Sequence, residues 1–225
     1  MVTMYSLLSA EQESVTVLRG PFRGARLFLI PKQSRRKIFG VYEHVLNGWL
    51  QKVLPEVDVV WDVGANDGYF CFGCARRILQ HQGRAAVVAF EPGLISGECM
   101  LEEASSLPMY RHVDFHFVPK LVSSEKSPDS VTLQQTYEER PELWDARSLV
   151  KVDVEGAELD VLAGAGELLR SPTQWVVEVH GKHLLEPVVE VFTKAGRDVE
   201  VIEPLPHWLL GAEQRTIHTC WVVTR

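Results

Sequence analysis

Four side chains that can move protons or hold cations lie at the ends of two predicted strands. Asp153 lies at the end of one strand with Glu155 in the turn that follows it, and Glu178 and His180 end another strand. Residues two apart in a strand point to the same face, so each pair is expected to present its side chains together. An imidazole titrates near neutral pH, which makes His180 the leading candidate for a general base that takes a proton from an alcohol.

The carboxylates leave several roles open. Asp153 or Glu178 could orient His180, or serve as the base in its place. Asp153, Glu155, Glu178 and His180 together are rich enough in oxygen ligands for Mg²⁺ or Mn²⁺, and such an ion would lower the pKa of a bound hydroxyl. Glu158 falls in the first turn of the next predicted helix, and we expect it only to stabilise that helix end.

A glycine turn earlier in the chain predicts a nucleotide-like ligand. The run VVWDVGANDGYF, residues 59–70, reads as a buried strand, a tight turn and the start of a helix. Helix N-termini that follow such turns bind ligands, and Gly64 and Gly68 would let the backbone approach one closely. The next predicted strand ends in Glu91, an acid placed to accept hydrogen bonds from both hydroxyls of a ribose.

The spacing and charge of the turn favour a cationic cofactor. Dinucleotide sites use G-x-G-x-x-G, whereas these glycines are spaced G-x-x-x-G. Asp62 and Asp67 would repel a pyrophosphate but suit the sulfonium and amino groups of S-adenosylmethionine. This favours S-adenosylmethionine over NAD, with an ordinary turn that binds nothing as the alternative. The predicted cofactor contacts are Asp62, Gly64, Ala65, Asn66, Gly68, Tyr69, Glu91 and Pro92, and we expect Tyr42 or Glu43 to touch the methionine end.

Strands and helices alternate along the chain. The periodicity predicts strands at 15–17, 26–30, 57–63, 85–90, 113–118, 149–154, 175–179, 199–202 and 217–223. It predicts helices at 41–54, 68–82, 95–105, 131–140, 157–169 and 184–195. Such alternation indicates a mostly parallel sheet with helices on both faces, and the last two strands should form an antiparallel hairpin. Residues 1–55 are expected to form a β-ribbon and helix appendage to a Rossmann-like domain at 56–225.

Composition and charge exclude several classes of protein. The 225 residues are 46% hydrophobic and 24% charged, which is ordinary for a globular domain. No apolar run approaches the roughly 18 residues of a membrane-spanning helix. The first residues lack the basic start and apolar run of a signal peptide, so a cytoplasmic location is expected. Seven basic and no acidic residues lie between Ser14 and Tyr42, but the net charge of −7 disfavours a nucleic acid partner.

The longer motifs resemble one enzyme family. The stretches RKIFGVYEHVLNGWL, VVWDVGANDGYF, VVAFEP, LVKVDVEGAELDVLAGA and WVVEVH are similar to those of the FkbM family of S-adenosylmethionine-dependent methyltransferases. The resemblance runs from about Phe39 to His180. It implies a seven-stranded Rossmann-like fold and methyl transfer, usually to oxygen on sugars or other natural products. It also implies that Asp62, Gly64, Asn66 and Gly68 contact the methionine part of the cofactor and that Glu91 contacts the ribose.

Three functional hypotheses follow. The first is methylation of a hydroxyl on a small molecule. The second keeps the cofactor but takes a macromolecule as substrate, although the turn Asp153-Val154-Glu155-Gly156 lacks the [D/N]-P-P-[Y/F] motif of enzymes that methylate base nitrogens. The third is a module that binds S-adenosylmethionine without turnover. A dehydrogenase is least favoured, and the sequence leaves the oligomeric state open.

Overall fold

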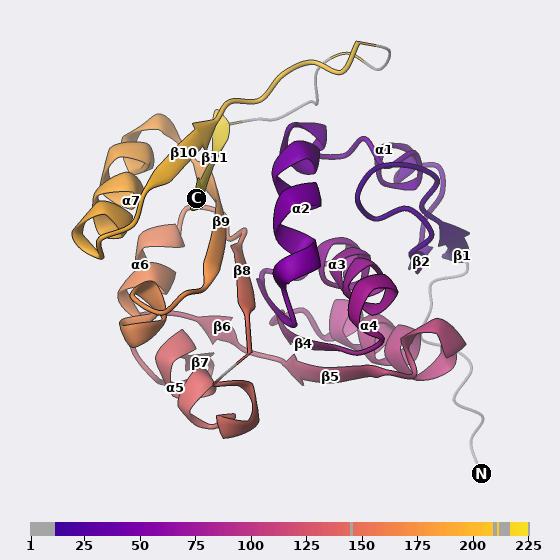
Figure 1. The fold of residues 1–225 in the computed structure, drawn as a ribbon, viewed down its shortest axis with the longest axis horizontal. Helices are drawn as coiled ribbons and strands as arrows, with labels where there is room; N and C mark the ends of the chain where they lie inside the picture. Colours follow the sequence, from indigo (N-terminus) through magenta and orange to yellow (C-terminus); the bar gives the residue numbers. More distant parts are fainter. Residues whose placement is uncertain (1–11, 145, 209–210, 212–216, 225) are drawn as a thin grey trace.

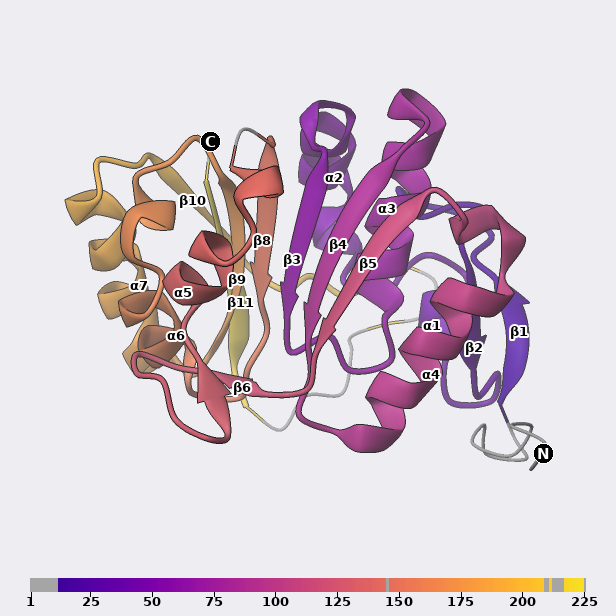
Figure 2. The same cartoon turned by 90° about the horizontal axis from the view of Figure 1, so that it is seen from below.

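A seven-stranded sheet forms the centre of the computed structural model, which describes residues 12–144, 146–208, 211 and 217–224. Its strand order is β10-β11-β9-β8-β3-β4-β5, and Figure 2 shows the middle strands side by side. The strands are β3 (Val59–Val63), β4 (Ala85–Phe90), β5 (Val113–Val118), β8 (Ser148–Val152), β9 (Gln174–His180), β10 (Val199–Ile202) and β11 (Thr219–Thr224). The predicted Rossmann-like fold class is confirmed.

The pairing is parallel through most of the sheet and antiparallel at one side. Strands β9, β8, β3, β4 and β5 run parallel to their neighbours. Strand β11 lies between β9 and β10 and is antiparallel to both. The predicted antiparallel hairpin of the last two strands is therefore present, and its second strand is inserted into the sheet. The start of β11 consequently lies at the edge where the parallel strands end.

Helices cover both faces of the sheet (Figure 1). The helices are α1 (Arg35–Ile38), α2 (Asn47–Val53), α3 (Tyr69–Gln82), α4 (Leu94–Ser106), α5 (Leu133–Glu138), α6 (Glu158–Ala163) and α7 (Lys182–Lys194). Short 3₁₀ turns occur at His44–Leu46, Leu54–Glu56, Pro108–Tyr110, Pro141–Leu143 and Gly166–Leu169. Figure 1 shows α5, α6 and α7 on one side of the sheet and α2 and α3 on the other.

Alternating residues of each strand enter two separate hydrophobic cores. On the face covered by α2 and α3, Val60, Leu149 and Val176 belong to one cluster of buried residues. On the opposite face, Val59 and Val150 belong to the other. Two-residue periodicity then places Asp62, Lys151, Asp153, Glu178 and His180 on the α2–α3 face, toward the carboxyl ends of their strands. The polar residues thus share one face because each continues the alternation of an apolar strand.

The N-terminal residues pack on the same face. A two-stranded ribbon of β1 (Glu13–Thr16) and β2 (Arg26–Leu29) precedes α1. Val17, Leu27 and Leu29 are buried in the cluster that also holds the side chains of α3. The division of the chain at residue 55 stays a prediction. Among the described residues, no helix has both the length and the apolar character needed to cross a membrane.

Two predicted helices are wrong in extent. The helix expected at 41–54 is replaced by a 3₁₀ turn and the shorter α2, because Glu43 has a left-handed φ of 47°. The helix expected at 157–169 ends at Ala163. At the next residue, Gly164, a Cβ would lie 2.1 Å from the carbonyl oxygen of Ser123, and Gly166 then takes a positive φ of 53°.

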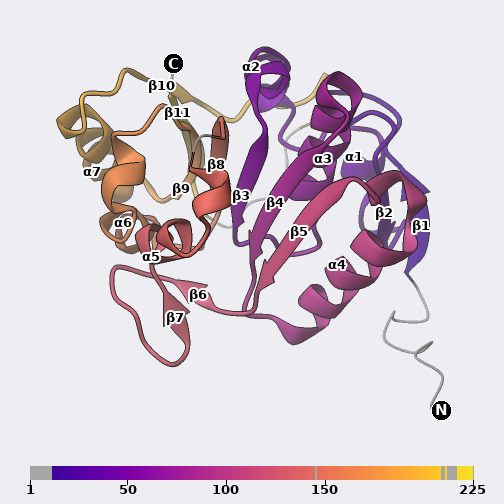
Figure 3. The same ribbon diagram turned by 60° about the horizontal axis from the view of Figure 1, so that its bottom comes forward.

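A small parallel pair, β6 (Leu121–Val122) and β7 (Ser130–Val131), was not predicted and is drawn at the bottom of Figure 3. The residues that form it were expected to be linker and the start of a helix. Each strand has only two residues, which is too short for a periodic pattern.

Candidate active site

A hollow of about 430 Å³ opens at the carboxyl ends of β3, β4, β8 and β9. Open α/β sheets bind their ligands at this edge, and the volume lies within the usual range for small-molecule sites. The hollow is lined by Tyr42, Gly64, Asn66, Glu91, Asp153, Glu155, Glu178 and His180. Seven of these eight residues were predicted as site residues, and the eighth, Tyr42, was one of two residues expected to touch the cofactor. The fold therefore brings together predicted residues that are far apart in the sequence.

The glycine turn forms one wall of the hollow. Gly64, Asn66 and Gly68 all have positive φ angles, of 82°, 48° and 74°. The amides of Gly64 and Ala65 both donate to the carbonyl of Phe90, which ties the turn to the end of β4. A Cβ on Gly64 would lie 2.0 Å from the backbone oxygen of Asp153. Gly64 is therefore needed for the close approach of two protein segments, whereas the sequence suggested approach of a ligand.

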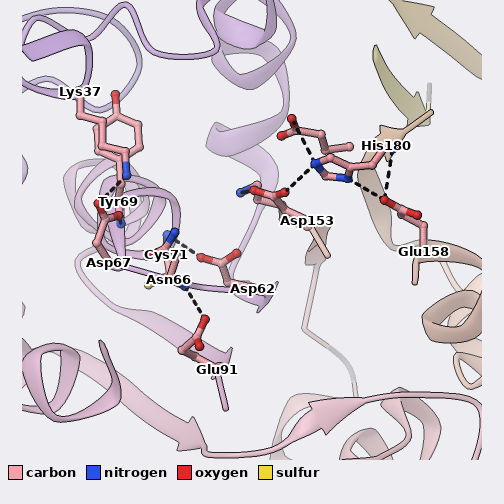
Figure 4. Close-up of polar contacts among 12 residues, drawn as sticks. Lys37, Asp62, Asn66, Asp67, Tyr69, Cys71, Glu91, Asp153, Glu158 and His180 are labelled. Carbon is pink, nitrogen blue, oxygen red and sulfur yellow. Dashed lines mark hydrogen bonds and ion pairs between the residues drawn. The ribbon is translucent and has the colours of Figure 1, made fainter. Parts of the chain in front are cut away.

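Glu91 follows the last residue of β4 and connects the glycine turn with the start of the next loop. Its Oε2 accepts the amide of Asn66 at 3.0 Å, and its Oε1 accepts the amide of Gly93 at 2.7 Å. Figure 4 shows the carboxylate directed toward the turn. The side chain is fixed at the mouth of the hollow by backbone donors.

Several other predicted cofactor residues do not line the hollow. Ala65 and Tyr69 are buried in the α2–α3 core. A Cβ on Gly68 would lie 2.8 Å from the ring of Phe72, so this glycine also serves internal packing. Pro92 is exposed beside Glu91 and is not part of the lining.

Asp67 was expected to contribute negative charge to the cofactor site, but it contacts other protein groups instead. Its carboxylate pairs with the ammonium group of Lys37 and accepts the amide of Tyr69 at 3.2 Å (Figure 4). It therefore stabilises the start of α3, and Lys37 neutralises its charge. Asp67 is not part of the lining, so the anionic character of the hollow comes from other residues, namely Glu91, Asp153, Glu155 and Glu178.

Asp62 lies beneath the hollow and is fully buried. Its Oδ2 accepts the amide of Cys71 at 3.1 Å, and its Oδ1 has no hydrogen-bond partner among the described residues. Burial raises the pKa of Asp62 to about 6. Asp62 thus stabilises the first turn of α3 through the amide of Cys71. It does not line the hollow.

Lys151 is the cation among these acids, and the sequence reasoning missed it. Its side chain is buried in β8, and its Nζ lies 2.8 Å from Oδ2 of Asp153. The ammonium also stands 5.1 Å from the centre of the Phe70 ring. Burial lowers the pKa of Lys151, but the surrounding carboxyl groups, Asp153 foremost, outweigh it, and the pKa lies well above its ordinary value. The sequence feature that could have indicated its role is a lysine within an otherwise apolar strand.

His180 ends β9 and is held by three carboxylates. Its Nδ1 lies 2.6 Å from Oε1 of Glu158, and the same oxygen accepts the backbone amide of His180 at 3.2 Å. Its Nε2 lies 3.7 Å from both Asp153 and Glu178. The hydrogen bond to Glu158 outweighs partial burial and raises the pKa of His180 above its ordinary value.

Glu158 is therefore more than a helix cap, which corrects the prediction for this residue. It is fully buried and comes from the first turn of α6, where Gly156 donates a further backbone bond at 3.3 Å. A carboxylate that accepts from Nδ1 leaves Nε2 to face the hollow, since the two ring nitrogens have separate roles. Nothing in the local sequence around Glu158 pointed to His180 as its partner.

Tyr42 lines the hollow from the N-terminal side, and the next residue, Glu43, is buried behind it. Burial is the main cause that raises the pKa of Glu43 to about 8, and a hydrogen bond with Glu178 adds to the effect. Burial also raises the pKa of Tyr42. Both side chains are thus expected to be neutral near pH 7. The turn that carries them places one hydroxyl and one carboxyl group beside the acids of β8 and β9.

Three of the four predicted catalytic residues lie close together, and the fourth, Glu155, lies apart from them. Asp153, Glu178 and His180 offer ligand atoms that all lie within 4.8 Å of one another, a spacing that a metal ion can bridge. Glu155 lines the exposed rim of the hollow and is not part of that group. Figure 4 shows Asp153 between the His180–Glu158 pair on one side and the Asn66 and Glu91 side chains on the other.

Part of the chain is similar to known methyltransferases. Residues 111–199 match the model of the methyltransferase FkbM domain. Hexuronic acid methyltransferase AglP of Haloferax volcanii is 27% identical over 164 residues, which cover 65% of this chain and 66% of that protein. The chain thus spans just under two thirds of the length of this curated relative.

Two solved structures share the fold. The methyltransferase FkbM from Methylobacillus flagellatus has a TM-score of 0.52 and 17% identity, over 75% of this chain and 44% of that one. The precorrin-6y C5,15-methyltransferase from Geobacter metallireducens has a TM-score of 0.51 and 16% identity, over 82% and 86% of the two chains.

Proposed function

We propose that this chain, whose residues 111–199 match the methyltransferase FkbM domain, is a methyltransferase of that family and transfers a methyl group from S-adenosylmethionine to a hydroxyl oxygen of a small molecule. The observation that carries the proposal is the orientation of His180. Glu158 holds its Nδ1 at 2.6 Å, so Nε2 faces a hollow at the ligand-binding edge of the sheet. A base fixed in this way is what deprotonation of an alcohol requires.

The residues of the hollow fit S-adenosylmethionine. Its lining carries four carboxylates, from Glu91, Asp153, Glu155 and Glu178, which suit a cofactor with a sulfonium and an ammonium group and no phosphate. Bound there, S-adenosylmethionine would supply an electrophilic methyl group, and its sulfur would keep the electron pair of the methyl–sulfur bond as a thioether. We place the methionine part near Gly64 and Asn66 and the ribose near Glu91.

The protein's part of the reaction is to position the acceptor and remove its proton. The proton of the acceptor hydroxyl passes to Nε2 of His180. Glu158 at Nδ1 and the carboxylates of Asp153 and Glu178 near Nε2 stabilise the imidazolium that results. Lys151 pairs with the Asp153 carboxylate at 2.8 Å and fixes its position. A positioned base of this kind contributes roughly 10²–10⁴-fold to a rate.

The acceptor is proposed to be uncharged. AglP is by its name a hexuronic acid methyltransferase, and a uronic acid acceptor would extend that chemistry to this chain. The four carboxylates of the hollow would repel a second carboxylate, so we favour a hydroxyl on a neutral sugar or another natural product. A nucleic acid acceptor is disfavoured for the same reason. The cytoplasmic location expected from the sequence stays a prediction.

A divalent ion is the second candidate for activating the hydroxyl. The cluster of Asp153, Glu178 and His180 would hold Mg²⁺ or Mn²⁺, and Glu155 would approach from the rim. Lys151 already occupies one oxygen of Asp153, which favours His180 acting as the base. Activity after dialysis against EDTA, and again after addition of each ion, separates the two mechanisms. Loss and recovery would assign the ion, and an unchanged rate would assign His180 alone.

Calorimetry with S-adenosylhomocysteine tests the cofactor, with NAD as the control. We expect binding of the former and none of the latter. Failure of S-adenosylhomocysteine to bind would end the proposal. Transfer of labelled methyl groups from S-adenosylmethionine to a panel of neutral alcohols then tests turnover.

Asp153→Ala and His180→Ala test the catalytic roles. Each is expected to abolish methyl transfer while S-adenosylhomocysteine still binds. Full transfer activity in both variants would remove them from the mechanism. Binding without any transfer across the panel would favour a module that senses the cofactor.

A further inference from the structure

A second hollow of about 190 Å³ lies next to the first, between the turn at Glu43 and the connection from β10 to β11. Most of its wall is apolar and comes from Val45, Pro204, Leu205, Pro206 and Ile217. The rings of His44 and His207 meet edge to face at 5.1 Å, which holds the two sides of this hollow together. A dry cavity of about 150 Å³ is enough to bind benzene, so the space admits a six-membered ring.

Thr219 is one of the residues that line this hollow. The residue is 3% exposed and is the first residue of β11. Its Oγ1 is buried and has no hydrogen-bond partner within the described part of the chain. Buried polar groups are nearly always paired, and an unpaired hydroxyl that lines a cavity is a position where a ligand group can complete the bond.

The sheet register connects this lining residue with the catalytic residues. Thr219 lies directly opposite His180, and Trp221 lies opposite Glu178. Opposed residues in an antiparallel pair point to the same face, with Cβ atoms about 4.5–5.5 Å apart. Glu43 lines this hollow and hydrogen bonds with Glu178, which lines the first hollow. The pair of Glu43 and Glu178 thus links the linings of the two hollows.

We propose that the second hollow binds the methyl acceptor, an alcohol or phenol with an apolar body about the size of one six-membered ring. Its hydroxyl hydrogen bonds to Thr219 and is thereby presented to Nε2 of His180. The proposal rests on the proposed methyltransferase function and narrows its substrate class. A polyhydroxylated sugar would set several hydroxyls against the apolar side chains of Pro204, Leu205 and Ile217, which offer them no hydrogen bond.

Two probes of equal ring size test the inference. Cyclohexanol carries one hydroxyl on an apolar ring, and methyl glucoside carries several on a ring of the same size. Methyl NMR of the protein saturated with S-adenosylhomocysteine would follow the signals of Val45, Ile217 and Thr219. We expect cyclohexanol to shift these signals at millimolar concentration and methyl glucoside to leave them unchanged.

Thr219→Val removes the hydroxyl at constant shape, and Thr219→Ser retains it. We expect the valine variant to bind cyclohexanol about five- to tenfold more weakly, which is the loss of one hydrogen bond. The serine variant should stay within about twofold of the wild type. Leu205→Asn, at an exposed wall position, should also weaken binding, and all three variants should bind S-adenosylhomocysteine as the wild type does.

The outcomes separate this inference from the function on which it rests. If S-adenosylhomocysteine binds but cyclohexanol shifts none of these signals, or methyl glucoside shifts them equally, the inference is overturned. Equal cyclohexanol affinity in the valine variant would remove the role of Thr219. No binding of S-adenosylhomocysteine would instead overturn the methyltransferase function itself.

Discussion

Nδ1 of His180 lies 2.6 Å from Oε1 of Glu158, a carboxylate that is fully buried although it belongs to the first turn of a helix. The two residues come from β9 and α6, and the same carboxylate oxygen also accepts the backbone amide of His180. The ring is thus fixed both by its side chain and by the strand that carries it. This relationship decides which nitrogen of His180 faces the candidate active site.

The first prediction concerns the titration of His180. The hydrogen bond to Glu158 favours the charged imidazole and raises its pKa, so Glu158→Gln should shift the midpoint toward lower pH. NMR of the ring Cε1–H signal measures this directly and needs no acceptor. Glu167→Gln, at an exposed position, is the control and should leave the midpoint where it is. An unchanged midpoint in Glu158→Gln would contradict the assigned role.

The same shift predicts the pH dependence of methyl transfer. A base must be neutral to accept a proton, so the rate should rise with pH through a midpoint above about 6.5, the ordinary value for histidine. Glu158→Gln should move that rise to lower pH. Initial rates from pH 6 to 9 with a fixed acceptor check both statements. A rate that falls across this range would exclude His180 as the base.

The second prediction concerns the glycine turn. Gly64→Ala would put a Cβ 2.0 Å from the backbone oxygen of Asp153 and strain a φ of 82°. Gly83→Ala is a matched control, because its φ is 75° and a Cβ there meets nothing within 4 Å. We expect Gly83→Ala to cost about 1–2 kcal/mol from backbone strain alone. Gly64→Ala should cost clearly more and should lose S-adenosylhomocysteine binding, as measured by urea unfolding and calorimetry.

The third prediction concerns the buried ammonium of Lys151. Lys151→Met would leave the carboxylates of Asp153 and Asp62 without their cation, and removal of one partner of a buried pair costs about 3–5 kcal/mol. Lys194→Met, in an exposed pair with Glu190, should cost less than about 1 kcal/mol. The loss in Lys151→Met should be smaller at pH 5 than at pH 8, since Asp62, whose pKa burial raises to about 6, can then take up a proton. Equal losses in both variants would contradict the role of Lys151 as an internal counter-ion.

The fourth prediction concerns Glu43 and the stability of the fold. Its pKa is about 8 in the folded protein and near 4.5 in an unfolded chain. The folded state therefore holds a proton that the unfolded state releases, and the wild type should lose stability as pH rises from about 4.5 to 8. Glu43→Gln removes this dependence.

The Glu43→Gln variant should consequently gain stability relative to the wild type between pH 5 and pH 8. The gain should be at least about 1 kcal/mol, since one pKa unit corresponds to roughly 1.4 kcal/mol. Glu190→Gln, on an exposed face of α7, should show no such trend. Urea unfolding at the two pH values provides the comparison, and a parallel pH dependence in wild type and Glu43→Gln would refute the prediction.

The sequence was sufficient to predict the bounds of strands whose residue pattern is local. The strands at 85–90, 113–118 and 199–202 have the predicted bounds, because each is an alternating or continuous apolar run between turn residues. The helix predicted at 157–169 was wrong beyond Ala163 because the backbone near Ser123 packs against Gly164. That contact joins residues far apart in the chain, and no periodic pattern records it.

The same distinction applies to the candidate active site. Asp153, Glu178 and His180 were predicted because they end strands, and strand ends meet at one edge of a parallel sheet. Asp67 was assigned to the ligand, but Lys37, thirty residues earlier in the chain, neutralises it. Glu158 and Lys151 were missed as site residues because their roles depend on which charges surround them after folding. Sequence pattern gives the position of a charge, and only the fold gives its partner.

The insertion of β11 between β9 and β10 affects how the molecule is assembled during synthesis. The residues that line the first hollow all precede Gly181, whereas Thr219 and Trp221, which line the second, leave the ribosome later. Until β11 arrives, β9 has an open edge, and open edges pair readily with other chains. A nascent chain can thus form the first hollow before the second, and β9 stays prone to pairing with other chains until β11 is in place.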